Sequence, residues 1–96
     1  MMVFDKIYGI YGSADLTSSV AGQEIAPDIR TLYGYTFQPI FSHLTIRVFA
    51  NCHISINGGD YMYIDVTTGG LNIKDFDITS VRIMESGINF HYVIGW

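Results

Sequence analysis

Apolar residues occupy every even position over a thirteen-residue stretch in the middle of this chain. The series comprises Leu44, Ile46, Val48, Ala50, Cys52, Ile54 and Ile56, and polar residues fill most of the odd positions between them. Because successive side chains of a β-strand point to opposite faces, this alternation predicts extended chain with one face in a core and one toward solvent. No segment shows a sustained helical period of about 3.6 residues, so we predict an all-β protein.

The alternating stretch is long for one strand, so we expect a turn or sharp bend near Asn51. A two-residue loop there would mix the two faces. A three-residue loop centred on Asn51 keeps the apolar face intact, because it pairs Val48 with Ile54.

The glycine pair at 58–59 predicts the next turn. A three-residue loop over residues 58–60 pairs Ile56 with Met62 on the apolar face. On the opposite face the same register sets His53 against Asp65, which would raise the histidine pKa and orient its ring.

Further short strands are expected at residues 33–40, where Pro39 marks an edge or an end, and at residues 71–73. A bend at Asp75-Phe76-Asp77 is followed by a predicted hairpin of residues 81–85 and 88–94 around Ser86-Gly87. Roughly six to eight short strands result, and strands at this spacing predict an antiparallel β-sandwich or jelly-roll-like barrel.

The first third of the chain differs in composition from the rest. Residues 13–28 carry serines, glycine and proline with scattered apolar residues, so we expect residues 1–30 to form an N-terminal strand and an extended arm. The strand is predicted within residues 3–11, and a helical turn at Ser13 would place Leu16 and Val20 on one side. Residues 31–96 are predicted to be the β-sandwich core of what is a single domain overall.

Length, charge and cysteine content narrow the class of protein. A chain of 96 residues supports one core. A net charge of −4 argues against a nucleic acid partner. No apolar run is long enough to span a bilayer, and the N-terminus lacks the features of a signal peptide, so we expect no membrane partner and synthesis in the cytoplasm. The single Cys52 excludes an internal disulfide and a thiolate zinc cluster.

Candidate catalytic pairs fail a geometric test on the sequence. Cys52 and His53 are neighbours, and on a strand they point to opposite faces, so the histidine cannot activate the thiol. Ser42 and His43 have the same defect. We therefore predict no catalytic residues and no enzyme activity.

No cofactor or metal site is predicted. The acidic residues Asp60, Asp75 and Asp77 offer oxygen ligands for calcium, but their spacing lacks the glycine and later glutamate of an EF-hand loop. We interpret them as solvated turns.

An aromatic stripe on the polar face is the main candidate for a binding surface. It would serve as a protein interface or a glycan site, and packing against a second sheet or the arm is the plain alternative. Trp96 would cap the core or fill a neighbour's pocket. The candidate residues are Phe49, His53, Asn57, Tyr61, Tyr63, Asp65 and Trp96.

Only 15% of the residues are charged, well below the roughly 25% of an average globular protein. A monomer of this composition would expose apolar patches, which usually mark contact sites, so we expect a homo-oligomer, either a trimer or a pentamer ring.

Four segments set the strand and turn rhythm of the chain, namely ISINGGD at 54–60, GGL at 69–71, ITSVRI at 78–83 and GINFHYVIGW at 87–96. This rhythm resembles that of small β-sandwich structural proteins of tailed bacteriophages. The resemblance implies a noncatalytic virion protein on the head, neck or tail, with other virion proteins as partners and its N-terminal arm on a neighbouring subunit. The alternative function is a glycan-binding module for host-surface recognition.

Overall fold

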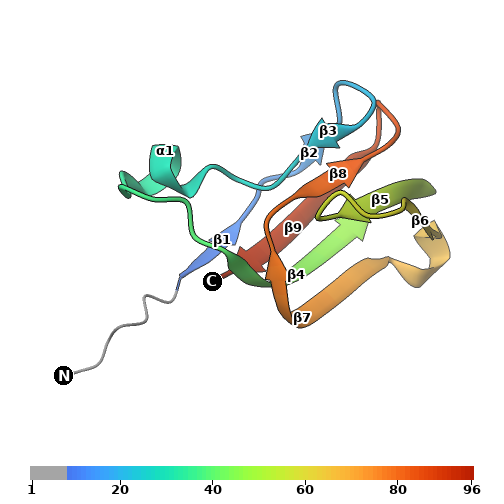
Figure 1. Ribbon diagram of the computed structural model, residues 1–96. Helices are drawn as coiled ribbons and strands as arrows, with labels where there is room; N and C mark the ends of the chain where they lie inside the picture. Colours follow the sequence, from blue (N-terminus) through green and yellow to red (C-terminus); the bar gives the residue numbers. More distant parts are fainter. Residues whose placement is uncertain (1–8) are drawn as a thin grey trace.

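The computed structural model describes residues 9–96, and within this range it contains nine β-strands, one α-helix and one 3-10 helix. The strands form two antiparallel sheets that pack against each other (Figure 1). The predicted all-β class and antiparallel sandwich architecture are therefore confirmed.

The two sheets are unequal in size. Sheet A has the strand order β1-β9-β4-β7, and β2 also pairs with β9. Sheet B has the order β3-β8-β5-β6. The strands of sheet A are β1 (Ile10–Gly12), β2 (Leu16–Thr17), β4 (Phe41–Val48), β7 (Gly70–Ile78) and β9 (Asn89–Gly95). Those of sheet B are β3 (Gln23–Glu24), β5 (Cys52–Ile56), β6 (Met62–Ile64) and β8 (Val81–Ile83). The helical segments are α1 (Ile29–Tyr33) and η1 (Val66–Thr68).

The alternating apolar residues line the space between the sheets, as predicted. On β4 and β5 the side chains with an exposed fraction of 1% or less include Leu44, Ile46, Val48, Cys52 and Ile54. The last strand and the residue before it add a second alternating set, in which Ile88, Phe90, Tyr92 and Ile94 are all buried. Alternation in the sequence therefore identifies the core face of both sheets.

The predicted pairing of β4 with β5 is wrong. Strand β4 pairs with β7 and β9, whereas β5 pairs with β6 and β8. The expected turn near Asn51 exists, but it carries the chain from sheet A to sheet B. Val48 and Ile54 therefore lie in opposite sheets. The same alternation fits both arrangements. The even-numbered side chains face the core whether β5 lies beside β4 or in the facing sheet.

The hairpin of β5 and β6 is present, but its predicted register is wrong by two residues. Ile54 lies opposite Met62, where Ile56 was expected. The turn begins early because Asn57 adopts a left-handed φ of 55° and the Gly59 N–H donates to the Ile56 carbonyl oxygen at 3.0 Å. A shift of two residues leaves every side chain on its predicted face.

The predicted hairpin of residues 81–94 is also wrong, because β8 lies in sheet B and β9 in sheet A. The residues between them cross from one sheet to the other. Strand β7 is longer than the expected 71–73 and runs through the predicted bend. The bend remains visible as an irregularity, since Asp75 has a φ of 58° and the β4–β7 register shifts between Phe41 and His43.

Residues 33–40 are not a strand. Asp28 caps the N-terminus of α1 by accepting a hydrogen bond from the Thr31 N–H, and Gly34 ends the helix in the left-handed conformation. The chain then runs irregularly to β4. The helical turn predicted at Ser13 is wrong as well, because Leu16 lies in β2.

The first described residues run along both sheets of their own chain. Strands β1 and β2 pair with β9, and β3 pairs with β8. Gly9 forms two backbone hydrogen bonds with Trp96, which ties the start of this segment to the last residue. Most of the strand predicted at 3–11 lies outside the described residues.

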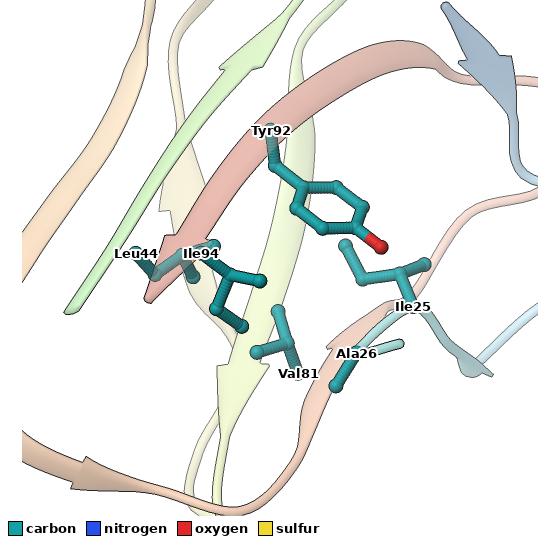
Figure 2. A pocket seen from close by; sticks show the side chains of 6 residues that line it. All are labelled: Ile25, Ala26, Leu44, Val81, Tyr92 and Ile94. Atoms are coloured by element: carbon teal, nitrogen blue, oxygen red, sulfur yellow. The ribbon is translucent and has the colours of Figure 1, made fainter. Parts of the chain in front are cut away.

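Figure 2 shows a point where the sheets and the segment after β3 meet in the interior. The side chains there belong to Ile25, Ala26, Leu44, Val81, Tyr92 and Ile94, and they leave no room for a water molecule. Burial, with a smaller contribution from Tyr11, raises the pKa of Tyr92. This part of the interior is packed core and holds no ligand site.

Candidate functional site

The aromatic residues among the predicted candidates are divided among different parts of the molecule. Phe49 follows β4 and lies on the outer face of sheet A beside His91 of β9, with ring centroids 5.5 Å apart. Tyr63 lies in sheet B, opposite His53. Trp96 lies at the end of the sandwich that carries α1 and the C-terminus (Figure 1). The crossing after β4 is the reason, because it places Phe49 and Tyr63 in different sheets.

On sheet B, the predicted contact of His53 with Asp65 is replaced by two others. The His53 ring lies 5.4 Å from the Tyr63 ring, centroid to centroid. Glu85 accepts a hydrogen bond from the His53 backbone N–H at 2.9 Å, and its second oxygen lies 2.5 Å from His53 Nδ1. Partial burial raises the pKa of Glu85, but the hydrogen bonds with His53 outweigh this effect and the net pKa is lowered. Glu85 thus connects β5 to the crossing between β8 and β9.

Asn57 and Asp65 are engaged in local structure. Asn57 Oδ1 accepts from the Thr79 N–H at 2.7 Å and from the Ser80 N–H at 3.2 Å, which ties the hairpin turn to the β7–β8 connection. Asp65 accepts from the Thr67 N–H at 2.9 Å and caps η1, and this hydrogen bond lowers its pKa.

Trp96 is the centre of an aromatic group that we call the aromatic end. Its ring centroid lies 6.0 to 6.3 Å from those of three other aromatic side chains, and Phe37 extends the group by stacking on Tyr35 at 5.8 Å. The indole also covers Gly9, where a Cβ atom would lie 2.1 Å from the ring. The aromatic end consists of Tyr33, Tyr35, Phe37, Phe41 and Trp96.

The aromatic end is only partly covered by its own chain. Trp96 and Phe41 are buried, whereas Tyr33 and Phe37 are about half exposed, at 50% and 51%. Three exposed aliphatic residues adjoin this group. Ile10 lies beside Trp96, and Leu32 and Ile40 belong to the same part of the chain as Tyr33 and Phe37. Trp96 Nε1 is buried and has no acceptor among the described residues. Buried donors are normally paired, so this atom is an unusual feature.

Sequence reasoning identified Trp96 but missed its neighbours. The signal was present, since Tyr33, Tyr35 and Phe37 recur at every second position. That spacing predicts a strand, but the Asp28 cap and Gly34 make the segment the end of a helix followed by a loop.

One catalytic candidate differs from expectation. Ser42 and His43 are within hydrogen-bonding distance, with Oγ and Nδ1 2.8 Å apart, because the strand is irregular at this point. The other side of the His43 ring lies against Gly95. Within residues 9–96 no carboxylate forms an ion pair with His43, so this pair lacks the third group that would orient and polarise the imidazole.

The remaining chemical groups lie apart from one another. Cys52 is buried, as predicted, and burial, with a smaller contribution from Glu85, raises its thiol pKa to about 11. In the part of the chain that the structure describes, no three His, Cys, Asp or Glu residues come close enough to hold a metal ion. In the same part of the chain no helix is long and apolar enough to cross a membrane.

Comparison with protein families, with curated proteins and with solved structures finds no match to this chain. The fold class and the surface chemistry therefore carry the functional argument.

Proposed function

We propose that this protein is a noncatalytic structural subunit that binds copies of itself through the aromatic end and forms part of the virion of a tailed bacteriophage. One observation carries the assembly part of the proposal. The aromatic end and its aliphatic neighbours expose a concentration of large apolar side chains at one end of the sandwich. Exposed apolar patches of this kind usually mark protein contacts.

A second copy is the occupant that fits this surface best. Aromatic residues are enriched at interface cores and charged residues are depleted there. The two charged residues at α1, Asp28 at its N-cap and Arg30 within the helix, already form an ion pair at 3.4 Å. A copy of the same surface is equally apolar, so neither partner has to bury an unpaired charge.

A matched pair of phenylalanines tests the interface. Phe37 and Phe76 are both 51% exposed, but Phe37 belongs to the aromatic end and Phe76 lies on β7. Size-exclusion chromatography with light scattering should give an oligomer for the wild type at about 50 μM, a shift toward monomer for Phe37→Ser, and no shift for Phe76→Ser. A wild type that stays monomeric, or an oligomer weakened only by Phe76→Ser, would overturn the proposal.

The virion assignment rests on the resemblance of the strand and turn rhythm to small phage structural proteins, together with the sandwich fold. Mass spectrometry of purified particles from a phage that encodes this sequence should detect the chain at a copy number typical of structural components. Its absence from intact particles would contradict the assignment and leave the oligomer to be explained separately.

A further inference from the structure

A second surface lies at the other end of the sandwich, where β4 ends and β9 begins. A hollow of about 400 Å³ is lined there by Asp15, Leu16, Thr17, Phe49, Asn89 and Phe90. This volume is within the range of small-molecule sites. Strand β9 separates the hollow from the aromatic end by about 20 Å, given a rise of about 3.3 Å per residue. The two surfaces are therefore independent.

An aromatic ring held by its neighbours forms one wall of the hollow. Phe49 is 49% exposed. The Arg47 guanidinium lies 5.6 Å from the Phe49 ring centroid, and the His91 ring meets it edge-on. These contacts restrict the ring before any ligand arrives, so a ligand that stacks on it pays little ordering entropy.

Polar groups from two segments, residues 15–17 and 89–91, surround this ring. The Thr17 hydroxyl donates to Asn89 Oδ1 at 2.7 Å, which fixes the amide and leaves its NH₂ group to donate. The Asp15 carboxylate lies 3.1 Å from His91 Nδ1 through one oxygen, and the residue is largely exposed. Asp15 therefore adds an acceptor on the same rim.

We infer that this hollow is a binding subsite for a neutral hexopyranose. A pyranose ring has an apolar face of C–H groups that packs on an aromatic ring, and its adjacent hydroxyls both donate and accept hydrogen bonds. Phe49 meets the first requirement, while the Asp15 carboxylate and the Asn89 amide meet the second. The buried Phe90 and the partly exposed Leu16 supply the apolar floor. The site is shallow and open, so binding of a single sugar is weak, with a Kd of about 1 to 10 mM.

Two-dimensional ¹H–¹⁵N NMR on the full chain tests the subsite. The probes are the methyl glycosides of α-D-glucopyranose, α-D-mannopyranose and β-D-galactopyranose, each added up to about 50 mM. At least one should shift the backbone signals of Thr17, Phe49 and Asn89 in a saturable manner. Phe49→Ala should weaken binding about 10-fold or more, because the stacking surface is lost.

The matched control is Tyr63→Ala, which removes an exposed aromatic side chain from the opposite sheet. This variant should bind the sugar with an unchanged Kd. Asn89→Ala is a second test that leaves the Phe49 ring in place, and it should weaken binding about 5-fold through loss of the amide hydrogen bonds. The proposal is overturned if none of the three sugars shifts any signal, or if the shifts cluster around Tyr61 and Tyr63 and disappear in Tyr63→Ala.

Sugar binding at this hollow does not depend on whether the chain forms an oligomer. If Phe37→Ser produces a monomer, that monomer should still bind the sugar with the wild-type Kd. If the sugar binds only to the oligomer, a subsite built by one chain is ruled out, while the interface at the aromatic end is unaffected.

Discussion

The two ends of this sandwich both expose aromatic side chains, but they surround them with different chemistry. At the aromatic end, Trp96 is buried among other rings and its exposed neighbours are apolar. At the opposite end, the exposed Phe49 ring has Arg47 and His91 against it and lines a hollow with Thr17 and Asn89. An exposed aromatic residue is therefore informative only together with its neighbours. Apolar neighbours favour a protein contact, whereas polar neighbours favour a small polar ligand.

The largest expected difference between the ends concerns stability. Trp96→Ala removes a side chain that is 9% exposed and that fills the aromatic end, so it should lower the free energy of unfolding by about 3 kcal/mol. Phe49→Ala removes a half-exposed ring and should cost less than about 1 kcal/mol. Urea denaturation of both variants in the same buffer measures the contrast. Equal losses would show that the two ends contribute equally to the core.

A smaller effect comes from the contact between Gly9 and Trp96. A Cβ at Gly9 would lie 2.1 Å from the indole, whereas a Cβ at Gly12 would have its nearest neighbour, Val93, at 3.9 Å. Gly9→Ala should therefore cost about 1 to 3 kcal/mol through displacement of the indole. Gly12→Ala should be close to neutral. If thermal unfolding shows the same stability for both variants, the indole does not lie against Gly9 in solution.

The smallest effect concerns the two histidine–carboxylate pairs, of which one lies on sheet B and one beside the hollow. The folded pKa of Glu85 is below its ordinary value of 4.5, so its ionised form stabilises the protein above that pH, and this contribution is lost as the pH falls through the lower folded pKa. Glu85→Gln should cost about 1 kcal/mol at neutral pH and should make stability fall less steeply below about pH 4.5.

Asp15→Asn is the control for that experiment. Asp15 forms its pair with His91 at 3.1 Å, but its side chain is 88% exposed. Exposed ion pairs contribute little, so this variant should leave the stability within about 0.5 kcal/mol of the wild type. Urea midpoints measured between about pH 6 and pH 3 compare the two. A steeper acid loss in Glu85→Gln than in the wild type would contradict the role given to the His53–Glu85 pair.

The core face of the fold was predictable from the sequence, but the neighbours of each strand were not. The alternation around Leu44 and Ile54 shows which side of the strand is apolar. The side to which each residue points is a local property of the strand. Whether β4 and β5 lie side by side or face each other is decided by contacts far along the chain. Adjacent segments therefore do not have to pair with each other. Of the predicted hairpins, only that of β5 and β6 exists.

The candidate surface was predicted less well, for the same physical reason. Phe49 and Tyr63 were grouped because their parity matches, but the crossing after β4 puts them on outer faces of opposite sheets. The aromatic end depends on Gly34 turning the chain after α1 and on Trp96 returning beside Gly9. The second of these is a contact between residues at opposite ends of the chain, which no pattern of neighbouring residues reveals.

Strand β9 also determines when this protein can fold. It pairs with β1, β2 and β4 and so lies in the middle of sheet A, yet it is the last of the described strands to leave the ribosome. Strands β1, β2 and β4 must wait without this partner while residues 49–88 are made. A chain with so many distant pairings is expected to fold slowly and to expose apolar strand edges until synthesis reaches Gly95.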